Sequence, residues 1–454
     1  MKEKIKLKEK LCYGVGDVGA NLVWTTVASF IAIYCTDVAG ISAAVLGTIL
    51  LVSRLLDGVS DVVMGTVIDR TKSKYGKARP WVLWSAPAMA VSIILLFNIP
   101  NFQEQGKNIY LLITYIFMAA FAFTASNLSY NTMLSLITTD ERERNSMNSI
   151  RFEFTMSAQL VINLITIPLV NYFGGGQIGW RIVSIIYAVV TFGTLFITFA
   201  GTRERVTEEK KTEKKTENKN VIKNLKILFK NKYFVLIMIV SAVMYIMLGL
   251  NASSRIYYAK YVLQNENLFS IMTTFIYIPT VLTILFVPIV VKKVGNINTL
   301  IIGFISYTIG FLIQTIFPTQ MSMIYMGMVF QGLGQSALYA CHYVVVSSIV
   351  DYSDWKDHCR EEGLIFSVTS FGQKVGNGLG TAGLGWLLSF GHYDGTKAVQ
   401  AASAITAIKW SYLFLPLALA LVAVILFWMM RGLDKLAPVI AKDLSMRAQT
   451  TEAE

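Results

Sequence analysis

Apolar runs of about 20 residues recur along the whole chain, separated by short polar segments. A helix of that length crosses the hydrocarbon core of a bilayer, whereas the strands of a β-barrel alternate over roughly ten residues. Only 15% of the residues are charged, compared with about a quarter in soluble proteins. We therefore expect an all-α polytopic membrane protein. The runs predict twelve transmembrane helices, at 15–35, 43–68, 81–98, 109–137, 151–172, 180–200, 234–258, 271–291, 298–316, 322–350, 364–389 and 405–430.

The positive residues indicate how the chain is oriented. With both termini in the cytoplasm, the cytoplasmic segments hold 32 Lys and Arg residues and the opposite loops hold five. Such an excess is typical of the cytoplasmic side. We expect a multi-pass protein of the cell membrane with both termini cytoplasmic. The formal charge of +12 then reflects topology and contact with the anionic headgroups of the bilayer, and no pattern indicates a nucleic-acid partner.

The longest polar segment, 201–233, divides the spans into six and six. It predicts a cytoplasmic linker, in which "VIKNLKILFK" has the spacing of an amphipathic helix on the membrane surface. The expected parts are an N-terminal six-helix bundle (1–200), this linker, a C-terminal six-helix bundle (234–430) and a cytoplasmic tail (431–454). A weak internal echo supports two pseudo-symmetric halves, because span 2 exits into "GTVIDRTKSKYGKARP" and span 8 into "VVKKVGNINT".

The second span contains "SRLLDGVSD", which places three ionisable residues in an otherwise apolar helix. Arg54, Asp57 and Asp61 are spaced i, i+3 and i+7, so they project from one face. Their insertion costs roughly 8–10 kcal/mol in total, at about 2.5–3.5 kcal/mol each. One interpretation is structural, with Arg54 paired to Asp57 and Asp61 bonded to a neighbouring helix. The interpretation we favour is a cation site, in which two carboxylates and the Ser60 hydroxyl hold Na+ or a transferable proton.

Polar residues of other spans fit a transport path. Span 1 has Asp17 and Asn21 on one face, and span 10 has Tyr339 and His342, which could equally be satisfied core groups. Lys374 in span 11 needs acidic partners, for which Asp57 and Asp61 are the candidates. Span 4 and the start of span 5 add Thr124, Asn127, Asn131 and Arg151. Amides and aromatic rings are the groups that sugar recognition uses.

Five motifs occur in order along the chain: "YGVGDVGAN…YCTDVAGI", "SRLLDGVSDVVMGTVIDRTKSKYGKARPW", "DERERNSMNSIRFE", "DYSDWKDHCREEG" and "GQKVGNG". Together they resemble the glycoside–pentoside–hexuronide:cation symporters, the melibiose-permease branch of the major facilitator superfamily. The resemblance covers essentially the whole chain, and the helix 2 block is its most specific part. It implies the major facilitator fold, with 12 transmembrane helices in two pseudo-symmetric six-helix bundles.

The resemblance also implies roles for individual residues. The coupling cation is expected at Asp57, Ser60, Asp61 and Thr124, with the two carboxylates as the metal ligands if the cation is Na+. Lys374 matches a lysine that interacts with these acids. The expected substrate-binding residues are Asp17, Asn21, Asn127, Asn131, Arg151, Tyr339, His342 and Lys374. The loop residues Asp69, Arg70 and Arg79 are expected to pair at the cytoplasmic surface and to brace one conformation as a gate.

Departures from melibiose permease bear on the substrate. Asn21 and Asn127 stand where that permease has two aspartates, Asn131 replaces a tryptophan, and Ser60 replaces an asparagine. These differences argue against melibiose and leave Na+, Li+ and H+ open. One hypothesis is an anionic sugar such as a uronide, since basic residues now outnumber acids. The hypothesis we favour is a neutral pentoside or glycoside, with Asp17 balancing an arginine.

The sequence thus predicts a secondary active symporter that takes up a sugar or glycoside (pentoside, glucoside or hexuronide) with Na+ or H+ by alternating access. No enzymatic nucleophile–base pair or phosphate-binding loop is present, and no cofactor beyond the coupling cation is expected. The alternatives are a lipid or nucleoside carrier on the same fold, and a sugar sensor that does not transport. The expected partners are the substrate and the lipid bilayer, and a monomer is expected.

Overall fold

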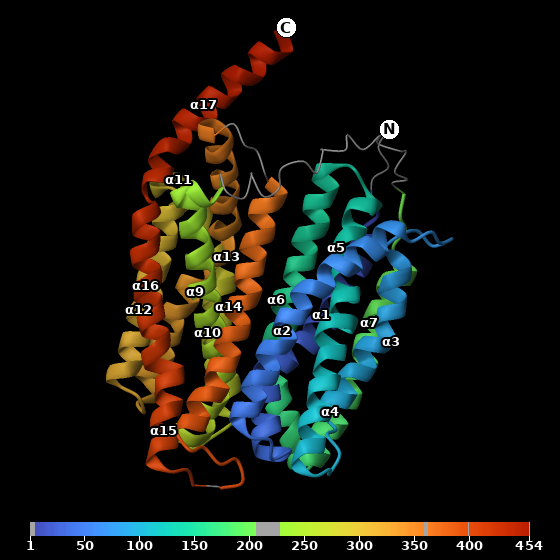
Figure 1. Cartoon of the computed structure of the whole chain (residues 1–454), viewed down its shortest axis with the longest axis vertical. Coiled ribbons are helices and arrows are strands. Elements are labelled where there is room, and N and C mark those ends of the chain that lie inside the picture. Colours follow the sequence, from blue (N-terminus) through green and yellow to red (C-terminus); the bar gives the residue numbers. More distant parts are fainter. Residues whose placement is uncertain (1–4, 206–227, 358–361, 398, 454) are drawn as a thin grey trace. The chain divides into compact units, whose positions relative to one another are not determined.

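The computed structural model describes residues 5–205, 228–357, 362–397 and 399–453. These residues form long α-helices joined by short loops, and four π-helical stretches interrupt or extend the helices (Figure 1). Most of the expected linker, including most of its amphipathic segment, lies outside the described residues.

In the described part of the first half, the chain forms seven α-helices and two π-helical stretches. They are α1 (Leu7–Ile33), η1 (Tyr34–Val38), α2 (Ala43–Arg70), α3 (Arg79–Leu96), α4 (Glu104–Ile116), η2 (Phe117–Phe123), α5 (Thr124–Ile137), α6 (Glu141–Tyr172) and α7 (Gly176–Gly201). The segments α4, η2 and α5 follow one another without a break and correspond to one expected span.

The second half follows the same plan. Its elements are α9 (Lys232–Tyr257), η3 (Tyr258–Val262), α10 (Leu268–Ile284), α11 (Val287–Val294), α12 (Asn296–Ile316), α13 (Met321–Asp357), α14 (Glu362–Phe390), α15 (Ala402–Lys409), η4 (Trp410–Phe414), α16 (Leu415–Met430) and α17 (Gly432–Ala453). The expected tail is therefore helical over most of its length.

Each of the twelve expected spans coincides with a helix or with consecutive helices. Within the described ranges, ten helical segments are long and apolar enough to cross a membrane. An eleventh is added if α10 and α11, which meet at a bend of 59°, count as one span. The twelfth, α14, does not meet the same test because glycines and polar residues such as Gln373 and Lys374 interrupt its apolar character.

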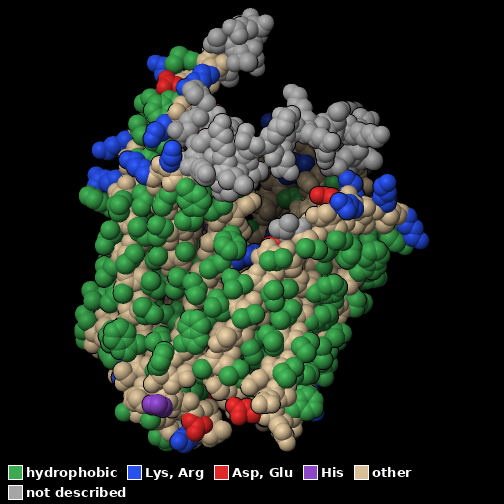
Figure 2. Space-filling model, in the orientation of Figure 1, with side chains coloured by type: hydrophobic (Ala, Val, Ile, Leu, Met, Phe, Trp, Pro, Cys, Tyr) green, Lys and Arg blue, Asp and Glu red, His purple; other side chains and the backbone are tan. Residues whose placement is uncertain are grey.

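The side chains have an inside-out distribution that a membrane explains. On α2, Val59 is 63% exposed whereas Asp57 is 4% exposed. Figure 2 shows hydrophobic side chains over the sides of the helices, with Lys, Arg, Asp and Glu gathered at their ends. Apolar side chains on the outside are stable in lipid, and polar groups are then stable only in the interior.

The chain divides into two compact units. Unit 1 comprises Met1–Glu209, Ala252–Thr273 and Thr381–Lys409; unit 2 comprises Lys210–Asn251, Thr274–Gly380 and Trp410–Glu454. In unit 1, α1 packs closely against α6 and α7 (Figure 1). A Cβ atom on Gly16 would lie only 2.5 Å from Thr198 Oγ1, so a small residue is needed at this crossing. The division into bundles at 1–200 and 234–430 stays a prediction.

A matching loop in each unit supports the internal echo noted in the sequence. Gly76, with φ of +107°, lies against Glu204, whose carboxylate accepts the backbone N–H groups of Lys77, Ala78 and Arg79 at 2.7–2.9 Å. The carboxylate thus caps the N-terminus of α3, where it compensates unpaired donors and the helix dipole.

The second loop repeats this arrangement within unit 2. Gly295, with φ of +90°, lies against Asp434, which accepts the N–H groups of Ile297 and Asn298 at 2.9 and 3.2 Å and caps α12. Both carboxylates come from just after the last expected span of their half. The two halves therefore share a loop in which a carboxylate caps the next helix, although the sequences of the two loops are hardly similar.

Candidate functional site

The four residues expected to bind the coupling cation converge in unit 1. Thr124 Oγ1 lies 2.9 Å from Asp57 Oδ1 and 3.4 Å from Asp61 Oδ1, so its one proton can go to either carboxylate. Ser60 Oγ lies 3.2 Å from the same hydroxyl. Asp57 and Thr124 are buried, and Asp61 and Ser60 are half-buried. Two carboxylates and two hydroxyls form a cluster of hard oxygen donors, which suits a hard cation or a proton.

Helix geometry explains why these residues meet. The spacing of Asp57, Ser60 and Asp61 puts them on one side of α2. Thr124 comes directly after η2, the π-helical stretch against which α2 packs. A π-helical stretch contains one extra residue per turn and shifts the register of the helical residues after it, and such stretches are frequent at functional sites.

Arg54, the third charged residue of this helix, does not pair with Asp57. Its guanidinium carbon lies 4.0 Å from the ring centroid of Trp24 on α1, and in the described part of the chain no ion pair joins it to a carboxylate. Trp24 in turn stacks on Phe123, with centroids 4.6 Å apart. A desolvated contact between a cation and an aromatic face contributes about 2 kcal/mol. The salt bridge between Arg54 and Asp57, one part of the structural interpretation, is thus not among the ion pairs of the described residues, and no sequence pattern indicated Trp24.

A second polar cluster in unit 1 brings together residues expected to bind sugar. Asp17 on α1 is buried, and Arg151 on α6 approaches it with Nε 3.3 Å from Oδ2. Arg151 also donates to Asn131 Oδ1 at 2.5 Å, and its guanidinium lies over the ring of Tyr130. The Thr155 hydroxyl donates to Asp17 as well.

Amide groups extend this cluster in two directions. Asn131 donates to Asn127 Oδ1 at 2.8 Å along α5. On the other side, Asn21 accepts from Gln159 Nε2 at 3.0 Å. Sequence reasoning missed Thr155 and Gln159, although they follow Arg151 at i+4 and i+8 and thus occupy the same face of α6.

Unit 2 contains the remaining residues expected to bind substrate. Tyr339 accepts a hydrogen bond from Gln335 at 2.7 Å, one turn away on α13. His342 is buried, with Nε2 3.0 Å from the amide nitrogen of Gln373, whose oxygen accepts from Tyr343. Tyr339 and His342 therefore both have partners within their own unit. Gln335 and Gln373 were not expected.

The other expected residues are placed as follows. Lys374 lies on α14 in unit 2, whereas Asp57 and Asp61 lie on α2 in unit 1, so their pairing stays a prediction.

At the end of α2, Asp69 and Arg70 are exposed, and among the described residues they form no ion pair with each other or with Arg79. Arg79 instead donates to the carbonyl of Phe199 on α7 at 2.6 Å. The paired gate stays a prediction for another conformation.

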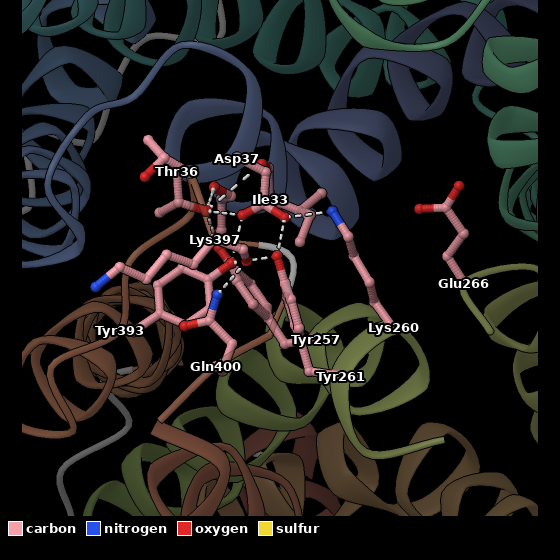
Figure 3. A network of polar contacts seen from close by, with 12 residues as sticks. Ile33, Thr36, Asp37, Tyr257, Lys260, Tyr261, Glu266, Tyr393, Lys397 and Gln400 are labelled. Carbon is pink, nitrogen blue, oxygen red and sulfur yellow. Dashed lines mark hydrogen bonds and ion pairs between the residues drawn. The ribbon is translucent and has the colours of Figure 1, made fainter. Parts of the chain in front are cut away.

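The opposite end of unit 1 holds a polar cluster centred on Asp37, which Figure 3 shows from close by. The Asp37 carboxylate, 4% exposed, accepts from Lys260 Nζ at 2.5 Å, from the Tyr261 hydroxyl at 2.6 Å and from the Tyr393 hydroxyl. Burial, followed by the nearby Tyr257 and Asp37, raises the pKa of Tyr393 far above its usual value, so this hydroxyl stays protonated and donates.

Two π-helical stretches carry this cluster. Asp37 belongs to η1, which ends the first expected span, and Lys260 and Tyr261 belong to η3, which ends the seventh. A second bond joins η1 to the end of α9, directly before η3, because Thr36 Oγ1 lies 2.9 Å from the hydroxyl of Tyr257. The cluster thus links equivalent helix ends of the two halves of the sequence, all within unit 1.

Comparison with known proteins identifies the family. A family model described as MFS/sugar transport protein matches residues 12–432. Among curated relatives, the isoprimeverose transporter of Lactiplantibacillus pentosus is 31% identical over 98% of this chain and 93% of its own length. The inner membrane symporter YicJ of Escherichia coli is 28% identical (91% and 89%), and the glucuronide carrier protein homolog of the same species is 25% identical (100% and 98%).

Solved structures support the fold. A mutant of the nucleoside transporter NupG matches 93% of this chain and 99% of its own with a TM-score of 0.70 at 14% identity. A bacterial homologue of the lysosomal transporter Spinster matches 95% and 97% with a TM-score of 0.61. The expected major facilitator fold is confirmed. The chain belongs to the MFS/sugar transport family, and within it to the glycoside–pentoside–hexuronide:cation symporters, which are membrane transporters and not enzymes.

Proposed function

We propose that this symporter takes up a neutral sugar or glycoside together with Na+ or H+, and that the cation binds at Asp57 and Asp61. The observation that carries the proposal is the position of the Thr124 hydroxyl, within 2.9 and 3.4 Å of the two carboxylates. Acids inside a membrane helix are costly and mark ion or proton paths. One cation moving through about 100 mV releases about 2.3 kcal/mol, enough for roughly 50-fold accumulation.

The sugar site is proposed to include Asp17, Asn21, Asn127, Asn131 and Arg151, whose donors and acceptors are suited to hydroxyl groups. A neutral substrate is favoured because Arg151 already has Asp17 as a counter-ion at 3.3 Å. The name of the isoprimeverose transporter points the same way, whereas that of the glucuronide carrier homologue keeps a uronide as the second candidate. The substrate roles of Tyr339, His342 and Lys374 stay predictions.

Both termini are proposed to be cytoplasmic, because this orientation puts the excess of Lys and Arg on the inner side. Asp69 would then face the cytoplasm and Asp394, in the loop before α15, would face outward. A membrane-impermeant maleimide added to intact cells should label Asp394→Cys and not Asp69→Cys. The reverse pattern would overturn the orientation.

The Asp37 cluster is proposed to close the outer end of the path. Alternating access requires that the two ends of the path open in turn. A buried carboxylate held by Lys260, Tyr261 and Tyr393 is suited to this task, because these groups can separate only by exchanging each other for water.

The test is uptake by the purified protein, reconstituted in vesicles, of a panel of glycosides and pentosides under a sodium or a proton gradient applied separately. Accumulation above equilibrium of a neutral sugar with one of the two gradients is expected. A sensor would bind sugar without accumulation. Accumulation of nucleosides or lipids alone would favour the carrier alternative, and competition by uronides alone would favour an anionic substrate.

A further inference from the structure

The buried Arg54 lies close enough in sequence to the proposed cation site to interfere with it. It lies three residues before Asp57 on the same helix, within the range at which opposite charges on a helix attract each other. In a buried site of low dielectric this attraction is stronger than at a surface. A guanidinium paired with Asp57 would neutralise the negative charge that draws in the coupling cation.

The structure places this guanidinium against an aromatic ring. Its carbon lies 4.0 Å from the Trp24 ring centroid, and Arg54 Nε has no hydrogen-bond partner in the described part of the chain. Arg54 is 4% exposed, so water offers it little alternative. Tyr115 on α4 lies near both Arg54 and Asp57 and is a second neighbour of the guanidinium. The aromatic face of Trp24 is thus its main support on α1.

Trp24 is itself fixed next to the cation site. Its ring stacks on Phe123 with centroids 4.6 Å apart and an interplanar angle of 27°. Phe123 ends η2 and directly precedes Thr124, whose hydroxyl contacts the carboxylates. The chain from Arg54 through Trp24 and Phe123 therefore ends at a proposed cation ligand.

We propose that Trp24 is a positioning residue for cation binding: it seats the guanidinium of Arg54 on its ring, so that Arg54 does not compete with the coupling cation for Asp57. This inference rests on the proposed binding of the cation at Asp57 and Asp61. Trp24 does not contact the cation. Its effect on the cation requires Arg54, which separates it from a purely structural role.

The experiment is a double-mutant cycle on reconstituted protein. Trp24→Ala should raise the cation concentration for half-maximal sugar uptake about tenfold, which corresponds to about 1.4 kcal/mol. Trp24→Phe keeps an aromatic face and should remain within about threefold of the wild type. In an Arg54→Gln background, Trp24→Ala should no longer change the cation dependence, because no guanidinium remains to move.

Sugar binding at saturating cation serves as the folding control and should be preserved in every variant. Unchanged cation dependence in Trp24→Ala, or an equal shift with and without Arg54, would overturn the role of Trp24. Asp61→Asn, measured alongside, separates the two proposals. If it retains cation-driven accumulation, the cation site itself is misassigned; if it loses accumulation while Trp24→Ala behaves as wild type, only the role of Trp24 fails.

Discussion

Arg151 on α6 lies against Asp17 on α1, with the guanidinium Nε 3.3 Å from the carboxylate Oδ2. The same arginine donates to Asn131, and Thr155 donates to the same carboxylate. The positive charge of this polar cluster is therefore balanced before any substrate arrives. This balance governs which sugars the cluster should accept.

Asp17→Asn is expected to raise the KM for a neutral sugar by about 10- to 100-fold, because hydrogen bonds to charged groups contribute about 1.5–3 kcal/mol. The variant also leaves Arg151 without its carboxylate. A uronide that competes weakly with wild-type uptake should then compete more strongly. Sugar and uronide titrations of uptake check this, with the cation dependence as control. Weaker competition by uronides in the variant would contradict the proposed charge balance.

Asp61→Asn should abolish concentrative uptake while sparing some sugar binding, because the neutral amide cannot compensate a cation. Uptake against a gradient and equilibrium sugar binding are the two measurements. Cation-driven accumulation by Asp61→Asn would remove Asp61 from the site.

Thr124→Ala should weaken the apparent affinity for the cation, because it removes the hydroxyl that lies near both carboxylates. Thr124→Ser keeps this hydroxyl and is the matched control.

Asp37→Asn should open the proposed outer end of unit 1 more often, because an uncharged amide binds Lys260 and the tyrosine hydroxyls more weakly. The native Cys35, which is buried two residues away, provides a reporter. In a chain whose other cysteines are replaced by serine, an impermeant maleimide should label Cys35 several-fold faster in Asp37→Asn.

Glu266→Gln is the matched control for this experiment. Glu266 lies near the same end of unit 1 and accepts from Asn171, and the Asp37 carboxylate does not contact it (Figure 3). Its replacement should change Cys35 labelling much less than Asp37→Asn does, because Glu266 acts on Lys260 only at longer range. Equal labelling of Cys35 in the Asp37→Asn variant and the parent would show that the cluster does not close the path.

The carboxylate caps of the two loops predict matching losses of stability. Glu204→Ala removes the acceptor of three N–H groups at α3, and Asp434→Ala removes that of two at α12. Each change should cost about 1–2 kcal/mol and lower the Tm in detergent. Glu204→Gln keeps one acceptor oxygen and should lose less. A loss for one loop only would argue against the repeated cap.

Much of this arrangement could be predicted from the sequence, because the membrane restricts where apolar and charged residues can lie. Long apolar runs predict the helices, and two acids within one of them predict a cation site, since charges there need a reason. Thr124, which the resemblance to the symporter family adds to this site, donates to Asp57. The bend between α10 and α11 was not predicted, because the apolar run continues across it.

Other features left no comparable signal. Trp24 is an aromatic residue in an apolar helix, where such residues are common. Only its contact with the Arg54 guanidinium, which the structure shows, suggests a functional role. Asp37 lies at the expected end of a span, where an acid is assumed to face water, yet its side chain is buried among residues more than 200 positions away. Contacts between residues so far apart in the sequence depend on how the helices pack, and the periodicity of the sequence does not predict this packing.

The π-helical ends of the first and seventh spans have a consequence for motion. A wide turn of this kind can tighten to ordinary α geometry by giving up one residue, and each residue in an α-helix corresponds to about 100° of rotation. Rewinding η1 or η3 would therefore turn Asp37 or Lys260 away from its partner without unfolding a helix. Because η1 and η3 end equivalent spans of the two halves, both halves have the same capacity for rotation at a helix end. These ends can rotate while the packed middle parts of the helices keep their positions.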